Sequence, residues 1–233
     1  MIFITGDMHG EHDIGKFTTG MFPEGTKLTK NDFVIITGDF GLFFLDPQDA
    51  TDKYWLDWLD EKPWTTLFCR GNHDNPFMLE ALPIEEMFGG KVGRAGNSIF
   101  FLRDGEIYTI ENKTFFVFGG ALSTDRKQRT EGEDWWREEI ASEQVQEYAL
   151  ENLHQHNLKV DYVITHTAPK RIVVDHILER FPVYHERAME PTAKFLDDVD
   201  NILEFGHWFF GHFHLEETYE DQYHVLYKNI IKL

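Results

Sequence analysis

Residues of the types that bind metal ions are grouped in a few short motifs of this 233-residue chain. In chain order they are Asp7 and His9 in TGDMHG, Asp39 in TGDF, Asn72, His73 and Asp74 in RGNHDNP, His166 after DYVIT, and His212 and His214 in GHFH. Carboxylates can bridge two cations, and imidazoles favour transition metals over Mg²⁺ or Ca²⁺. The carbonyl oxygen of Asn72 adds a ligand without adding negative charge. This donor set predicts a pair of divalent ions about 3.5–4 Å apart, with His73 left over as a proton donor.

The elements that must position these residues are short apolar runs of strand length. The runs cover residues 2–4, 33–36, 66–69, 161–165 and 208–210, and each ends where one of the polar groups begins. Continuous apolar runs are typical of strands buried on both faces of a sheet. Glycines beside several of these endings allow sharp turns and a close approach of the backbone.

Helix-like stretches separate the apolar runs. They cover residues 49–61, which Pro63 stops, and residues 134–154, and Ala168-Pro169 opens a third. Strands that alternate with helices predict βαβ units, in which ligands lie beyond the carboxyl ends of the strands. The polar endings are therefore expected to converge on one site from distant parts of the chain.

Two further regions read as antiparallel strands. Residues 98–102, 107–110 and 114–118 predict a meander, and residues 217–219 and 224–227 predict a final hairpin around Asp221. There is no internal repeat or low-complexity linker, so we expect a single domain over residues 1–233.

Composition excludes several classes of function. The chain is 42% hydrophobic, which is ample for a core, and its net charge is −19 with no basic patch, which makes long nucleic acid an unlikely ligand. No apolar run is long enough to span a membrane, and the N-terminal residues do not resemble a signal peptide. Cys69 is the only cysteine and lies in an apolar run, where it is expected to pack, and a single cysteine fits a cytoplasmic location.

The weaker interpretation of each motif is an ordinary polar loop, because D-x-H or G-H-x-H alone is common by chance. Five such endings after five strand-like runs make that interpretation much less favourable. The remaining histidines have no ligand-like neighbours and are expected mostly at the surface: His12, His154, His156, His176, His185, His207 and His224.

In this order, the motifs from Asp7 to His214 resemble the signature set of the calcineurin-like metallophosphoesterases. The resemblance implies an α/β sandwich of two mixed β-sheets flanked by helices, with metals at the C-terminal ends of the strands. It also implies two ligand sets that share a bridging Asp39. The first set is Asp7, His9, Asp39 and His214, and the second is Asp39, Asn72, His166 and His212.

The activity implied is hydrolysis of a phosphodiester or phosphomonoester, by attack of a metal-bound hydroxide with His73 as general acid. Asp74 is a candidate for orienting His73. Mn²⁺ is the expected metal, and the donor set also admits Fe, Zn, Co or Ni.

Two alternatives stay open at this point. A protein Ser/Thr phosphatase is less favoured. In those phosphatases the second motif continues with an Asp and an Arg, whereas Phe40-Gly41-Leu42 follows Asp39 in this chain. A non-catalytic scaffold with this fold is expected to lose ligands or the acid histidine, and this chain retains them all.

Residues 119–139 are a candidate lid that sets specificity for a small or nucleotide-like substrate. In that interpretation Arg126 or Arg129 holds a phosphate oxygen and a tryptophan stacks on a ring. The competing interpretation is a structural loop with Trp135 anchoring the following helix in the core. Arg70 and Arg94 are further candidates for binding phosphate.

Overall fold

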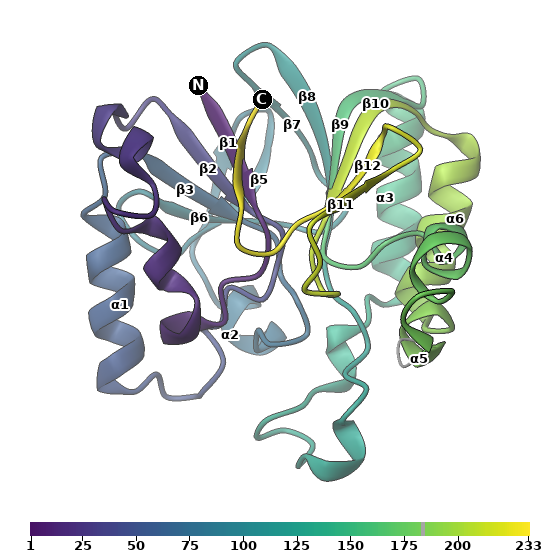
Figure 1. The fold of residues 1–233 in the computed structure, drawn as a ribbon, viewed down its shortest axis with the longest axis horizontal. Coiled ribbons are helices and arrows are strands. Elements are labelled where there is room, and N and C mark those ends of the chain that lie inside the picture. Colours follow the sequence, from purple (N-terminus) through teal and green to yellow (C-terminus); the bar gives the residue numbers. More distant parts are fainter. Residues whose placement is uncertain (183–184) are drawn as a thin grey trace.

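The structure is a computed structural model that describes residues 1–182 and 185–233. Two mixed β-sheets pack face to face and helices cover their outer faces, which confirms the predicted sandwich (Figure 1). The first sheet has seven strands, in the order β13 (Ile230–Lys232), β1 (Ile2–Thr5), β2 (Phe33–Ile36), β3 (Thr65–Phe68), β6 (Ile99–Leu102), β5 (Gly90–Arg94) and β4 (Ile84–Met87). The second has six, in the order β11 (Glu217–Tyr219), β12 (Tyr223–Val225), β10 (Glu204–Phe210), β9 (Lys159–Thr165), β8 (Lys113–Phe118) and β7 (Ile107–Ile110).

The strands that precede the polar motifs run parallel at the centre of each sheet. β1, β2 and β3 pair in parallel in the first sheet, as do β9 and β10 in the second. All residues of β1, β2 and β3 are buried, as their continuous apolar runs predicted. Parallel strands end at one edge of their sheet, so the segments that follow them emerge together.

A core cluster between the sheets holds them face to face. Ile4 and Ile35 from the first sheet share this cluster with Val117 and Ile164 from the second, and all four are fully buried. Burying an aliphatic side chain of this size contributes about 1.5–3 kcal/mol. The shared core supports the single-domain organisation, which we retain as a proposal.

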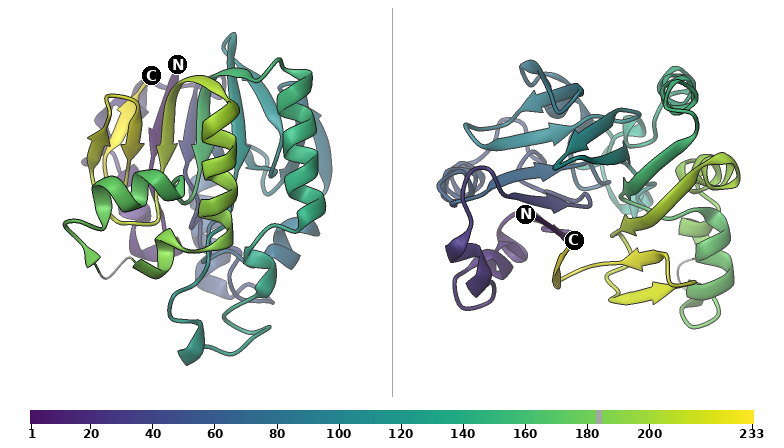
Figure 2. Two further views of the ribbon diagram at one scale, coloured as in Figure 1. Left: turned by 90° about the vertical axis from the view of Figure 1, so that its right-hand side faces the viewer. Right: turned by 90° about the horizontal axis from the view of Figure 1, so that it is seen from above.

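Two of the longer helices, α1 (Ala50–Asp60) and α3 (Glu143–Gln155), begin at side-chain capping residues. Asp49 caps α1 by accepting hydrogen bonds from the amides of Thr51 and Asp52, each 2.8 Å long. α3 and α6 (Pro191–Ile202) cover the outer face of the second sheet (Figure 2). Shorter helices complete the chain: α2 (Pro76–Glu80), α4 (Lys170–Ile172), which a π-helical turn over Val173–Ile177 continues, and α5 (His185–Ala188).

The predicted helix over residues 134–154 is wrong over residues 134–142. The helix begins at Glu143 with Ser142 as its N-cap, and only a 3₁₀ turn forms before it, over Arg137–Glu139. Trp136 and Glu139 are both buried in that stretch, within a loop whose tertiary contacts outweigh helical propensity.

The predicted meander is also wrong in its first strand. β6 pairs in parallel with β3 in the first sheet, with Leu67 opposite Phe100, whereas β7 and β8 form a hairpin in the second. Every residue of β6 is buried, which is typical of a central strand covered on both faces. The C-terminal hairpin of β11 and β12 is confirmed, and its turn places Asp221 in left-handed backbone conformation.

Candidate metal centre

The five polar endings converge at the carboxyl ends of the parallel strands. Asp7, Asp39 and Asn72 follow β1, β2 and β3, and His166 and His212 follow β9 and β10. The backbone amide of His212 donates to both carboxylate oxygens of Asp7, each 3.0 Å away, which joins the first ending to the last. Residues 205 positions apart in the chain are thereby in direct contact.

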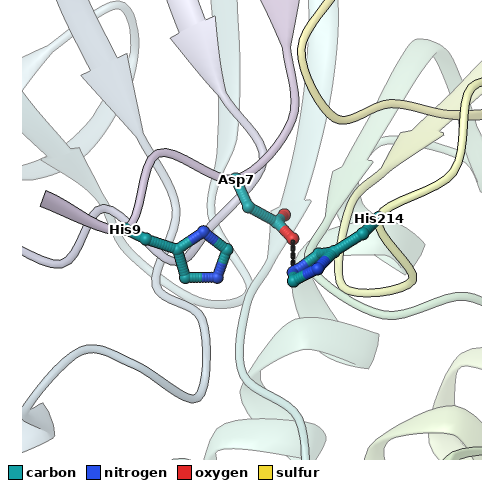
Figure 3. A group of neighbouring side chains, drawn as sticks. All are labelled: Asp7, His9 and His214. Carbon is teal, nitrogen blue, oxygen red and sulfur yellow. Dashed lines mark ion pairs between the residues drawn. The ribbon is translucent and has the colours of Figure 1, made fainter. Parts of the chain in front are cut away.

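One group of potential ligand atoms gathers around Asp7. Nε2 of His214 lies 3.2 Å from Oδ2 of Asp7, and the ligand atoms of Asp7, His9 and His214 all lie within 4.8 Å of one another (Figure 3). Nε2 of His9 lies 3.2 Å from Oδ2 of Asp39. The structure therefore brings together the four residues expected around the first metal.

A second group surrounds the other oxygen of Asp39. Nε2 of His166 lies 3.2 Å from Oδ1 of Asp39 and 3.2 Å from Oδ1 of Asn72. Nδ1 of His166 lies 2.9 Å from the carbonyl oxygen of Thr37, which can only accept, so Nδ1 carries a hydrogen and Nε2 faces the oxygens. Asp39 thus lies between the two groups, with one oxygen turned toward each.

His212 packs against the second group and gives the clearest test of whether a metal fits. Its ring packs 4.9 Å from that of His166, and its Nε2 is buried without a hydrogen-bond partner among the described residues. Burial, followed by the positive charge of Arg187, lowers the pKa of His212 well below its usual value. A neutral imidazole with an unpartnered buried nitrogen fits a metal ligand, and the surrounding carboxylates and imidazoles fit a divalent transition metal.

Charge within the cluster is balanced between carboxylates and imidazoles. Burial, the largest single influence, favours the neutral form of His9 and of His166, but the neighbouring carboxylates of Asp39 and Asp7 together outweigh it and raise the pKa of each to about 9. Burial also favours a protonated Asp39, yet His166 and His73 hold its pKa well below the usual value. The site therefore presents an ionised carboxylate at its centre, as a bridging ligand requires.

Left-handed backbone conformation recurs among the same residues. His9, Asp39, His212 and His214 all have left-handed backbone conformations, with φ of 48°, 45°, 65° and 52°. Non-glycine residues adopt this region rarely, and such strain clusters at functional sites. The neighbouring glycines are required for space, since a Cβ on Gly211 would lie 1.9 Å from Oδ1 of Asp7 and one on Gly71 2.0 Å from Oδ1 of Asp39.

His73 borders the cluster and a pocket of about 560 Å³. Its backbone amide donates to Oδ1 of Asp39 at 2.8 Å, and its ring packs against those of His9 and Phe44. Burial, the largest influence, lowers its pKa. The ligand atoms of His9, Asp39 and His73 also lie within 4.8 Å of one another, so the ring of His73 lies beside the candidate ligands.

Asp74 does not orient His73, and this prediction needs correction. Its carboxylate accepts hydrogen bonds from the amides of Phe40, Gly41 and Gly71, at 3.1, 2.7 and 2.7 Å. Both oxygens are used to join the loops that follow β2 and β3. Its burial, the largest influence, raises the pKa of Asp74 to about 6.

Of the arginines expected to bind phosphate, only Arg129 lines the pocket. Arg70 is buried and forms an ion pair of 2.6 Å with Asp104, so its contacts are structural and its predicted role needs correction. Arg94 pairs with Glu85, and Nη1 of Arg126 donates to the carbonyl oxygen of Ser123. Arg129 pairs with Asp125 at 2.8 Å and lies over the ring of Phe44.

Segment 119–139 packs against the edge of the site, and most of it is the loop that projects at the bottom of Figure 1. Trp136, rather than Trp135, is its buried tryptophan, and its ring meets the edge of Phe44 at 5.4 Å. Two buried carboxylates hold the start of the segment: Glu139 accepts from the amide of Ser123, and Glu190 accepts from the amide of Leu122, both at 2.6 Å. The structural-loop interpretation is thus supported, with the neighbouring tryptophan as the anchor.

Sequence reasoning missed Asp13 and Tyr227, which contact the candidate ligands. Oδ2 of Asp13 lies 3.1 Å from Nδ1 of His9, and the hydroxyl of Tyr227 donates to the same carboxylate oxygen at 3.2 Å. The ring of Tyr227 stacks on His214 with centroids 4.5 Å apart. The spacing of His9 and Asp13 is a weak signal for this contact, whereas nothing near Tyr227 marks it. His12 also lines the pocket, which was not expected of a surface histidine.

Comparison with known proteins identifies the family of this chain. A family model described as calcineurin-like phosphoesterase matches residues 1–216. A crystal structure of a protein of unknown function from Aquifex aeolicus resembles this chain with a TM-score of 0.34 and 16% identity, over 70% of this chain and 76% of that one. No curated protein shows a significant match. Among the described residues, no helix is both long and apolar enough to cross a membrane.

Proposed function

This chain belongs to the calcineurin-like phosphoesterase family, and on that premise we propose that it hydrolyses phosphate esters with the help of two divalent cations. The observation that carries the proposal is the position of Asp39, whose oxygens face His9 on one side and His166 with Asn72 on the other. Asp7, His9, Asp39 and His214 would hold one cation, and Asp39, Asn72, His166 and His212 the other. Mn²⁺ is the proposed metal, and Fe, Zn, Co or Ni also suit these donors.

Divalent cations bound there would acidify a water molecule and offset negative charge on the phosphoryl group. The residues of the chain supply the remaining functions. Asp39 fixes the spacing of the two ligand sets, and the strained loops hold the imidazoles in place before substrate arrives. His73, which lines the pocket beside them, is the proposed donor of a proton to the departing oxygen. Phe44 forms an apolar wall next to His73, which favours exclusion of bulk water.

The pocket indicates the size of the substrate. Its volume of about 560 Å³ falls within the range of about 300–1,000 Å³ that is typical of small-molecule sites. Arg129 is the arginine of its lining and is proposed to contact a substrate anion. A small or nucleotide-like phosphate ester is therefore the proposed substrate, and a net charge of −19 disfavours long nucleic acid. We retain the cytoplasm as the proposed location.

Hydrolysis of matched aryl phosphates tests this function. Protein stripped of metal and reloaded with Mn²⁺ is assayed with a phosphate monoester and the corresponding diester of one phenol. Turnover of either supports the hydrolase, and the ratio of the two rates separates a phosphodiesterase from a phosphatase. Absence of turnover on both, with two cations bound, would favour the non-catalytic scaffold.

A further inference from the structure

The amide of Asn72 has two chemically different ends, and only one of them can bind a cation. Its oxygen accepts and can coordinate, whereas its NH₂ group donates and cannot. Asn72 is 6% exposed, with Oδ1 3.2 Å from Nε2 of His166. Its Nδ2 donates to Oγ of Ser123 at 3.3 Å. The contact at Nδ2 therefore favours the orientation in which the amide oxygen faces the site.

Ser123 accepts from Asn72 because its own hydrogen is used elsewhere. Its Oγ lies 2.7 Å from Oε2 of Glu139. Burial raises the pKa of Glu139 to about 7, and above that pH the ionised carboxylate can only accept. A hydroxyl has one hydrogen, which Ser123 gives to Glu139, so its lone pairs are left for the NH₂ group of Asn72. The direction of every hydrogen bond from Asn72 to Glu139 is thus determined by the carboxylate at the far end.

Glu139 is built firmly into this position. It is fully buried, and its Oε1 accepts from the amide of Ser123 at 2.6 Å and from Nε1 of Trp135 at 2.8 Å. Nη1 of Arg70 donates to the carbonyl oxygens of Glu138 and Glu139, at 2.8 and 2.9 Å. Asn72, Ser123 and Glu139 thus form a chain of hydrogen bonds, called the relay below. Arg70 and Asn72 lie two positions apart on one loop, so that loop contacts both ends of the relay.

We propose that Ser123 and Glu139 are positioning residues that set the orientation of the Asn72 amide, so that its oxygen faces the second cation. The inference rests on the proposed function, since it takes Asn72 as a ligand. It assigns segment 119–139 the role of supporting a ligand, in addition to any contact with substrate. Partners that orient a ligand in this way typically change metal affinity about 10–100-fold when they are removed.

Glu139→Gln is the sharpest test, because it changes the direction of the relay with almost no change in shape. The new amide can still accept from the backbone of Ser123 and from Trp135 through its oxygen, while its NH₂ group donates to the hydroxyl of Ser123. The hydroxyl hydrogen is then released, so the hydroxyl can donate to Oδ1 of Asn72 as well as accept from its Nδ2, and the relay no longer sets which end of the amide faces the cation. Glu138→Gln makes the same chemical change at the exposed neighbouring residue and serves as the matched control.

The measurement is calorimetric titration of metal-free protein with Mn²⁺, with thermal unfolding of each variant alongside. We expect the affinity for the second equivalent to fall about 10–100-fold in Glu139→Gln and in Ser123→Ala, with the first equivalent and the unfolding midpoint little changed. Ser123→Thr, which keeps the hydroxyl, should restore the second site. The double variant should lose no more than either single variant, because both break one relay.

Three results would overturn the inference. In the first, Glu139→Gln and Ser123→Ala bind the second Mn²⁺ as tightly as the wild type does. In the second, Ser123→Thr binds the second Mn²⁺ as weakly as Ser123→Ala does. In the third, the variants lose both metal sites and their unfolding midpoint falls strongly, which would indicate a structural role. A wild-type protein that binds no second Mn²⁺ is a different failure, because it overturns the proposed function as well.

Discussion

Asp39 has a central position among the candidate ligands, since its two oxygens face different imidazoles. Replacing the carboxylate by an amide removes one negative charge and one bridging oxygen. We expect Asp39→Asn to reduce metal affinity by more than the ~10–100-fold cost of losing an outer partner. Metal content after dialysis against a fixed Mn²⁺ concentration measures the change. Asp57→Asn on the exposed side of α1 is the control, and wild-type metal content in Asp39→Asn would refute a bridging role.

His73 is the residue on which the chemical step is proposed to depend. General acid catalysis contributes about 10²–10⁴-fold, and the contribution is largest when the leaving group is poor. We expect His73→Ala to lower kcat by that order for an alkyl ester and by much less for a nitrophenyl ester, with both metals retained. Rates on this pair of esters, together with metal content, provide the check. Full activity on the alkyl ester would remove His73 from this role, and loss of metal would identify it as a ligand.

Individual residues differed in how far the sequence could predict them. The ligands could be predicted because each follows a strand-like run, so their convergence follows from the fold alone. Asp74 was misassigned because adjacency in the chain does not determine where a side chain points, and three backbone amides hold it. Ser123 was missed because its contact with Asn72 crosses 51 positions of the chain, and Tyr227 because its ring packs on His214 from a separate strand-connecting segment.

The loops that follow the strands hold the site in place, and the glycines within them have little spare room. A Cβ on Gly211 would lie 1.9 Å from Oδ1 of Asp7, so Asp7 must move. We expect Gly211→Ala to lower the free energy of unfolding by about 1–3 kcal/mol and to weaken metal binding. Urea unfolding and Mn²⁺ titration measure the two effects. Gly20→Ala, where a Cβ meets nothing within 4 Å, is the matched control, and equal behaviour of the two variants would contradict the packing argument.

The junction between segment 119–139 and α6 is predicted to depend on pH. Burial raises the pKa of Glu190 to about 8, above the ordinary value of 4.5. The folded state therefore keeps a proton that the unfolded state has released, so this stabilisation is complete below about pH 4.5 and is lost as pH rises through 8. Between these two pH values, Glu190 lowers the free energy of unfolding by up to about 1.4 kcal/mol per pH unit.

Glu190→Gln should remove that slope, because glutamine stays neutral throughout. Urea unfolding of metal-free protein at pH 5 and pH 8 provides the comparison. We expect the variant to lose less stability than the wild type between the two values, while Glu151→Gln on the exposed face of α3 behaves as the wild type does. An identical loss in Glu190→Gln and the wild type would show that Glu190 titrates normally.

Elements were predictable where local pattern and tertiary environment agree. β1, β2 and β3 are buried on both faces, as their continuous apolar runs predict. The first strand of the meander was assigned to the wrong sheet because short turns resemble hairpins, whereas residues between β6 and β7 cross from one sheet to the other. The prediction of a helix before Glu143 was wrong because Trp136 and Glu139 are buried by long-range contacts that no local pattern encodes.

At the scale of the whole molecule, the net charge and the size of the pocket both favour a small substrate. The 41 acidic residues against 22 Lys and Arg disfavour a long polyanion, while the pocket beside His73 suits a small one. The cations would make the site itself locally positive within this acidic surface. A small phosphate ester can use that positive site without contacting a basic surface.

The most direct test of the account is activity followed against metal equivalents. Metal-free protein is titrated with Mn²⁺ while hydrolysis of an aryl phosphodiester and monoester is recorded, and bound Mn²⁺ is measured at each step. We predict little turnover up to one equivalent and full turnover at two, because the ligand sets on both sides of Asp39 must be filled. Turnover without metal, or two bound equivalents with no turnover of either ester, would contradict the account.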